Sequence, residues 1–130
     1  MPSLKCIVVT PEQTVEDRAA DFVALPLYDG ELGVAPGHTP MIGRLGYGEL
    51  RIVNEGQTTR YYVDGGFAEV ADNVVSVLTN HAVPAKQLDA AKAETQLEAA
   101  RSRPANTPEL LAIRDRDQQR ARAQIRVAKK

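Results

Sequence analysis

The chain changes character at Pro84, and this change constrains the fold more than any other feature of the sequence. Before Pro84, short runs of β-branched and apolar residues alternate with turn-forming residues. After it, Ala, Glu, Gln, Lys and Leu dominate. The first pattern is typical of short β-strands and the second of α-helices. Because 130 residues leave room for one main core and a small appendage, we expect two domains, residues 1–84 and residues 85–130.

The segment before Pro84 predicts a small β-sandwich. Six runs have strand character: residues 4–10, 22–25, 49–53, 61–63, 67–70 and 74–78. The sequence Asn54-Glu55-Gly56 predicts a hairpin turn, and Asp72-Asn73 predicts a second turn. Many short strands with this spacing indicate a sandwich, or flattened barrel, of about ten short strands. With two phenylalanines and no tryptophan, its core must consist mainly of Val, Leu, Ile and Ala.

The segment after Pro84 predicts an α-helical hairpin. A first helix is expected over residues 88–101, where small apolar residues recur at helical spacing: Ala90, Ala93, Leu97 and Ala100. Thr107 and Pro108 are typical of the start of a second helix, which runs towards the C-terminus. Its expected buried stripe contains alanines and one charge: Leu110, Ile113, Asp117, Ala121, Ile125 and Ala128. We therefore expect the two helices to be weakly held.

Charge is distributed unevenly along a chain that has 16 basic and 17 acidic residues. The segment from Lys86 to Lys130 contains 11 Lys/Arg and 6 Asp/Glu, whereas the preceding 85 residues contain 5 and 11. Opposite net charges indicate that the two parts do different jobs. The acidic sandwich lacks an aromatic platform with interleaved Arg and Lys, which disfavours a nucleic-acid-binding module.

The cysteine content and the lengths of the apolar segments indicate the compartment and the kind of membrane association. A single cysteine, Cys6, cannot form an internal disulfide, which favours a reducing compartment. The N-terminal residues have no apolar core of signal-peptide length, and no window approaches the ~18 apolar residues that cross a bilayer. Any association with a membrane is therefore expected to be indirect, through partners.

The stretch DGELGVAPGHTP, residues 29–40, is the densest cluster of unusual residues. Its glycines match neither GxGxxG nor GxxxxGK, so a phosphate-binding loop is disfavoured. We interpret it as a stiff surface loop in which glycines supply unusual backbone angles and Pro36 and Pro40 restrict the chain. His38 and His81 lack Cys, Asp or Glu at ligand spacing. Without a catalytic constellation or a metal cluster, we expect neither catalytic residues nor a metal site, and no enzyme.

Five motifs, in order and spacing, resemble the epsilon subunit family of the F-type (proton-translocating) ATP synthases: DGELGVAPGHTP, GELRIV, YVDGGFAEV, VSVLTNHAV and QLDAAKAE. The resemblance runs from about Leu4 to about Glu98 and is weaker from Ala99 onwards. It implies a β-sandwich followed by a helical hairpin, in a non-catalytic subunit of the rotating central stalk. Such a subunit couples proton flow to ATP synthesis, is bound to the gamma subunit and the c-ring, and is peripheral on the cytoplasmic face of the bacterial inner membrane rather than in an organelle.

The resemblance also implies interface residues. Four residues of the Gly/Pro-rich stretch and its flank become candidates for contact with gamma or the c-ring: Tyr28, Glu31, Gly33 and His38. The hairpin is implied to be regulatory, since basic residues of the second helix approach an acidic segment of the β subunit in the alpha/beta catalytic head and hinder ATP hydrolysis. The corresponding candidates here are Arg116, Arg120, Arg122 and Arg126. A solvated helix face is the alternative interpretation of the same arginines.

Some bacterial members of the family bind ATP on the hairpin, through a motif that LDAAKA (residues 88–93) matches except that Lys92 replaces an arginine. Lysine attracts phosphate but lacks the planar fork of arginine. The candidate site consists of Asp89, Lys92, Arg122 and Arg126, and no other cofactor is required. Asp89 is equally compatible with an ordinary helix start. The alternative function is a stand-alone ATP-sensing or nucleic-acid-binding β-sandwich module.

Overall fold

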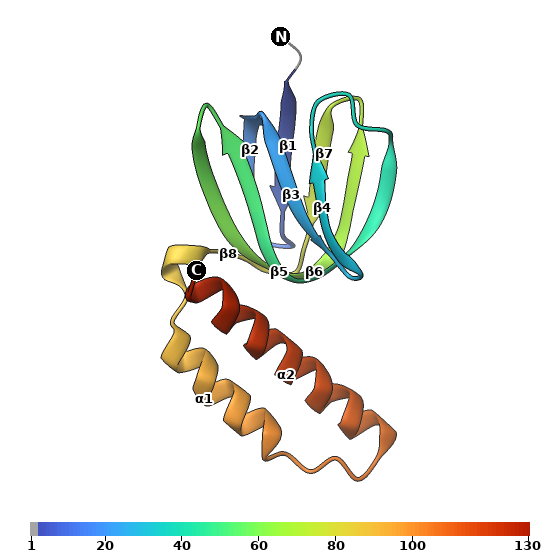
Figure 1. The fold of residues 1–130 in the computed structure, drawn as a ribbon. Coiled ribbons are helices and arrows are strands. Elements are labelled where there is room, and N and C mark those ends of the chain that lie inside the picture. Colours follow the sequence, from blue (N-terminus) through green and yellow to red (C-terminus); the bar gives the residue numbers. More distant parts are fainter. Residues whose placement is uncertain (1–2) are drawn as a thin grey trace. The chain divides into compact units, whose positions relative to one another are not determined.

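The computed structural model of the chain describes residues 3–130. The chain divides into two compact units, Met1–Ala85 and Lys86–Lys130, one residue from the predicted boundary. Within the described residues, the first unit holds eight strands, whereas the second holds two α-helices (Figure 1). A single 3-10 turn, η1 (Ala85–Gln87), spans the boundary. The N-terminal sandwich and the C-terminal helical hairpin are both as predicted.

One continuous sheet builds the first unit. Its strands are β1 (Leu4–Val9), β2 (Thr14–Ala20), β3 (Phe22–Leu27), β4 (Gly30–Val34), β5 (Met41–Asn54), β6 (Gln57–Ala71), β7 (Val74–Leu78) and β8 (Ala82–Pro84). They follow the order β2-β1-β7-β6-β5-β3-β4, and β8 pairs with β6. Every pairing is antiparallel except that between β1 and β7. Figure 1 shows the strands gathered around a common interior.

The interior of the sandwich is aliphatic, as the composition predicted. Its fully buried side chains come from seven strands and include Leu4, Val8, Ala20, Val23, Leu25, Val34, Leu50, Ile52, Val63, Val70, Val75 and Val77. Burial of each Val, Leu or Ile side chain contributes about 1.5–3 kcal/mol to folding. The core is therefore mainly aliphatic, with Tyr61 as an aromatic member.

Strands β5 and β6 are much longer than the sequence predicted, at 14 and 15 residues. The runs at residues 61–63 and 67–70, predicted as two strands, belong to β6. One edge of β6 pairs with β5 throughout, while the other pairs with β8 through residues 61–63 and with β7 through residues 67–71. Gly66, at φ 108°, lies at the change of partner. The prediction of about ten short strands is thus replaced by eight strands, because glycines let β6 bend without ending.

Three strands were missed: β2, β4 and the short β8. Strand β2 has the polar sequence TVEDRAA and lies at one end of the strand order. Strand β4 lies inside the Gly/Pro-rich stretch, so the prediction of a loop over all of residues 29–40 is wrong for its first half. Backbone pairing from Val23 opposite Val34 to Leu27 opposite Gly30 holds β4 against β3. The predicted turns are confirmed: Glu55 and Gly56 have φ of 52° and 79°.

The second unit is a pair of antiparallel helices, α1 (Ala90–Arg101) and α2 (Pro108–Ala128) (Figure 1). The predicted N-cap of α2 is confirmed, since Thr107 Oγ1 accepts a hydrogen bond from the backbone N of Leu110 at 3.1 Å. The buried residues of the two helices are Ala93, Leu97, Ala100, Ala121, Ala123 and Val127.

The predicted stripe of α2 is wrong at Leu110 and Ile113, which are each 41% exposed. Helix α2 has 21 residues against 12 in α1. Arg103, which follows α1, pairs with Asp117. The first turns of α2 therefore extend past the end of α1 and have no helix opposite them.

Candidate functional site

The turn between β3 and β4 presents Tyr28 to solvent, with 69% of the residue exposed. Its backbone N donates to the carbonyl oxygen of Arg44 at 2.8 Å, and the Arg44 guanidinium lies 4.5 Å from the centre of the Tyr28 ring. A cation over an aromatic face holds both side chains in place. This turn is therefore an ordered, exposed aromatic feature, as an interface residue requires.

Glu31 lies on β4 and is held by Arg51 of β5. The guanidinium donates from Nη2 to Oε1 at 3.0 Å and from Nη1 to Oε2 at 3.2 Å, so the pair is bidentate. Arg51 also contacts the buried carboxylate of Glu49, which Arg60 Nε reaches at 2.6 Å. Burial alone lowers the pKa of Arg51, but the hydrogen bond to Glu31 and the two carboxylate charges raise it overall. Arg51, held in turn by Glu49, which Arg60 also contacts, thus fixes Glu31 on the outer surface.

His38 is not gathered with Tyr28 and Glu31, whereas Gly33 lies two residues after Glu31 on the same face of β4. A Cβ atom at Gly33 would lie 2.7 Å from Phe22 Cζ, so this glycine makes room for the Phe22 ring. His38 belongs to the turn after β4, where its backbone N donates to Ala35 O at 3.2 Å. Five residues of strand span roughly 15 Å, so Tyr28 and His38 lie at opposite ends of β4. The single interface loop that the sequence predicted is two separate surfaces.

An exposed apolar face on β5, β6 and β7 was missed from the sequence. Its residues are Ile42, Phe67 and Leu78, which are 74%, 59% and 53% exposed. Phe67 lies opposite Leu78 on one side and opposite Arg44 on the other, and Ile42 lies two residues before Arg44 on the same face. The signal was the alternation in FAEVA: Ala68 and Val70 are buried, so Phe67 must point outward.

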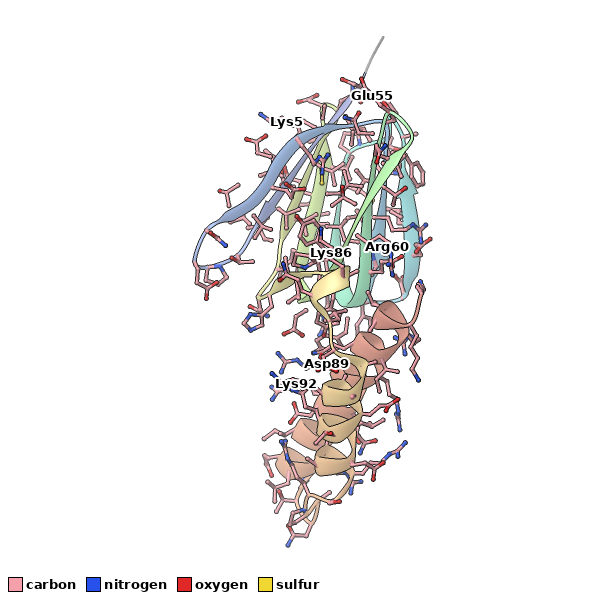
Figure 2. All side chains as sticks on the ribbon, turned by 90° about the vertical axis from the view of Figure 1, so that its left-hand side faces the viewer. Lys5, Glu55, Arg60, Lys86, Asp89 and Lys92 are labelled. Carbon is pink, nitrogen blue, oxygen red and sulfur yellow. The ribbon has the colours of Figure 1, made fainter. Side chains whose placement is uncertain are left out.

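Asp89 and Lys92 lie together at the start of α1, as Figure 2 shows. Asp89 is the N-cap residue, and its Oδ1 accepts from the backbone N of Lys92 at 3.2 Å. Glu94 pairs with Lys129, and Arg103 pairs with Asp117, which sets the register of the antiparallel helices.

In this register Arg122 lies beside the second half of α1, roughly 13–18 Å from Asp89 along the helix axis. The structure therefore does not place Arg122 with Asp89 and Lys92. Arg126, one turn further along α2, is closer to the start of α1. The four residues predicted to bind ATP do not form one compact site in this arrangement.

The four candidate arginines of α2 differ in environment. Arg116 and Arg120 approach Asp117 at 3.4 and 3.8 Å, so both belong to an ion-pair cluster. Arg122 and Arg126 are exposed and lie one turn apart, and Arg122 Nη2 donates to Gln118 Oε1 at 3.3 Å. Arg122 and Arg126 are thus the exposed candidates that lie outside the ion-pair cluster around Asp117.

Across residues 3–130, no three His, Cys, Asp or Glu side chains are placed to hold a metal ion. Burial raises the pKa of Cys6 to about 12, so its thiol stays protonated. Neither helix in the same range is both long and apolar enough to cross a bilayer.

Comparison with known proteins agrees with the fold. A family model, the β-sandwich domain of the ATP synthase delta/epsilon chain, matches residues 3–85. An ATP synthase epsilon chain of Rhodopirellula baltica is 54% identical over 127 residues, covering 98% of this chain and 99% of the relative. That of Carboxydothermus hydrogenoformans is 43% identical over 100 residues, covering 77% and 75%. A chain of the Euglena gracilis mitochondrial ATP synthase has the same fold, with a TM-score of 0.86 at 24% identity over 95% of this chain and 79% of that one.

Proposed function

The chain belongs to the ATP synthase delta/epsilon chain family and is a rotor-stalk subunit of an F-type ATP synthase, and on that premise we propose that it is non-catalytic and works by docking. Its sandwich binds the rotor, and its hairpin regulates ATP hydrolysis. A chain of this fold comes from the central stalk and c-ring of the Tetrahymena thermophila mitochondrial enzyme, which supports this assignment. The subunit then lies at the periphery of the membrane sector, on the cytoplasmic face of a bacterial membrane.

The apolar face of Ile42, Phe67 and Leu78 is the observation that carries the proposal. Large side chains on three neighbouring strands are exposed to water, and a contiguous exposed apolar patch marks a protein interaction site. Arg44 and Glu69 border the patch and supply a polar rim. We assign this face to the gamma subunit, because a shaft that turns with the sandwich needs a large and permanent contact.

The β3–β4 turn is assigned to the c-ring. Tyr28 and Glu31 are exposed there, and each is fixed by an arginine, Arg44 and Arg51. Fixed side chains lose little conformational entropy on binding, which favours recognition. His38, at the other end of β4, is not part of this surface.

Arg122 and Arg126 are the proposed regulatory contact. Both are exposed on α2 and one turn apart, so they present two positive charges to an acidic segment of the β subunit. Arg116 and Arg120 already neighbour a carboxylate and contribute less. Reversal of both charges, Arg122→Glu with Arg126→Glu, should relieve inhibition of ATP hydrolysis in the reconstituted complex. Equal hydrolysis rates with and without the two substitutions would contradict this role.

ATP binding remains a prediction from the resemblance. A helix N-terminus favours anions, and Lys92 adds a positive charge beside it. Arg122 is too far along the helix to join them, and one oxygen of Asp89 already caps the helix. Calorimetric titration of the full chain with ATP decides the matter, and absence of heat would remove ATP from the function.

The docking proposal is tested by the affinity of the full chain for the gamma subunit. Phe67→Asp places a charge in the centre of the apolar face, and loss of such a central aromatic typically costs about 2 kcal/mol or more, or roughly 30-fold in Kd. Thr58→Asp, at an exposed position of the same strand β6, is the matched control and should leave the Kd within about twofold. Equal binding by the two variants would overturn the assignment of this face.

A further inference from the structure

The two helices of the hairpin have little apolar surface with which to hold each other. Of their six buried residues, four are alanines, and only Leu97 and Val127 are larger. Alanine buries little more than one methyl group, so its contribution to packing is small. Something other than apolar burial must supply much of the preference for the closed pair.

Asp117 gathers three arginines at the loop end of the hairpin; we call these four residues the loop-end cluster. Arg103 Nη1 donates to Asp117 Oδ2, and the guanidinium groups of Arg116 and Arg120 lie 3.4 and 3.8 Å from Oδ1. The backbone N of Arg103 donates to Ala100 O at 3.3 Å, which fixes Arg103 to the last turn of α1. The Arg103–Asp117 pair therefore connects the end of α1 to the middle of α2.

A second ion pair connects the helices at the other end, where Lys129 Nζ lies 3.2 Å from Glu94 Oε1. Both of its side chains are more than half exposed, at 61% and 54%, so water weakens it. The Asp117 side chain is only 20% exposed. Charges that are partly withdrawn from water interact more strongly, so the loop-end cluster is the stronger of the two connections.

We propose that Asp117 is an electrostatic clasp that keeps the hairpin closed. Its carboxylate neutralises three guanidinium groups and ties α1 to α2 where the apolar seam is weak. Loss of that one charge removes the attraction between the helices and leaves three neighbouring positive charges that repel one another. Both effects raise the free energy of the closed hairpin relative to the open one. The consequence for regulation rests on the proposed function: an opened hairpin frees α2 to reach the catalytic head.

The test measures hairpin opening in the full chain by electron paramagnetic resonance. Spin labels at Gln96→Cys on α1 and Gln119→Cys on α2, both exposed positions, report the distance between the helices. The native Cys6 can be retained because it is fully buried and its pKa is about 12, which makes it unreactive. The measured quantity is the fraction of molecules with the long distance.

Asp117→Asn should raise the ratio of open to closed molecules about three- to tenfold, as expected for a partly buried charge with several partners. Glu98→Gln is the matched control. It also removes one carboxylate, which pairs with Arg101 of the same helix at 2.7 Å and does not join the two helices. Identical distance distributions for the two variants would overturn the clasp.

Arg103→Gln tests the same connection at a residue of the loop between α1 and α2. Because Arg103 is not in a helix, the effect of this substitution does not depend on helix propensity. It should open the hairpin in the same direction, and adding it to Asp117→Asn should give less than the sum of the two effects. Full additivity would contradict a direct Arg103–Asp117 connection. Binding of the gamma subunit by the sandwich is measured in a separate experiment. A negative result for hairpin opening therefore does not contradict the docking proposal, and a negative result for docking does not contradict the clasp.

Discussion

Gly66→Ala is the sharpest test of the bend that lets β6 change partners. A Cβ atom built at Gly66 lies 2.0 Å from the carbonyl oxygen of Leu78 and 2.9 Å from Thr79 Cα. These are backbone atoms of β7 and of the residue after it, so no side-chain rotation relieves the contact. The backbone angle φ of 108° is itself unfavourable for any residue with a Cβ atom.

The size of the effect follows from these two contributions. The backbone angle costs an alanine about 1–2 kcal/mol. Relieving the contact separates β6 from β7 at the Phe67–Leu78 pair and weakens ladder hydrogen bonds worth about 1 kcal/mol each. The expected loss in the free energy of unfolding is therefore about 3–5 kcal/mol.

Gly65→Ala is the control because it changes the neighbouring residue of the same bend. Gly65 has φ of 70°, and its added Cβ meets only Tyr47 Cε1, at an ordinary 3.7 Å. This variant should lose only the backbone contribution, about 1–2 kcal/mol. Urea denaturation followed by tyrosine fluorescence measures the free energy of unfolding of both variants, since all four tyrosines lie in the sandwich. A difference below about 1 kcal/mol between the variants would refute the steric reasoning.

Three further changes probe other parts of the structure. Thr107→Ala removes the side-chain oxygen that accepts from Leu110 N, and it should destabilise α2 by about 1 kcal/mol in thermal melts followed at the helix wavelength; an unchanged melt would contradict the cap. Glu49→Gln removes the charge of a carboxylate that is 6% exposed and pairs with two arginines, and it should lower the free energy of unfolding in urea by about 2–3 kcal/mol. Glu31→Gln, at an exposed carboxylate, should lower it by less than about 1 kcal/mol. Equal losses for the two variants would contradict this ranking. Because the pKa of the folded Cys6 thiol, about 12, lies above its ordinary value of 9.0, its contribution to stability is present below pH 9 and is lost as the pH rises towards 12. Between pH 9 and pH 10 the wild type should therefore lose about 1 kcal/mol more than Cys6→Ala, and parallel losses would show that the thiol is not buried.

The candidate interface shows where sequence reasoning reached its limit. Tyr28 and Glu31 were correctly expected at the surface, because turn-forming residues mark exposed chain. Their separation from His38 was not visible, because five residues of the apparent loop form strand β4 against β3. Glycine-rich sequence favours a loop locally, and only pairing with a distant strand overrides that preference.

The missed apolar face has a different cause. Phe67 could be assigned outward from the alternation in β6, but its neighbours come from residues 25 positions before it and 11 after it. Alternation says which side of a strand a residue faces, and it says nothing about which strands lie beside it. The patch exists only once β5, β6 and β7 are paired.

Features that depend on a few consecutive residues were determined by the sequence alone. These are the change from strands to helices near Pro84, the turns at Glu55-Gly56 and Asp72-Asn73, the Thr107 cap and the aliphatic core. Each is set by local backbone preference or by composition, so it does not need the rest of the molecule.

Tertiary structure decided the parallel pairing of β1 with β7, the bend of β6 across two partners, the apolar face and the gathering of three arginines around Asp117. Each depends on contacts between residues that are far apart along the chain. Such contacts are selected by the burial and pairing of whole strands and helices, which no local pattern encodes.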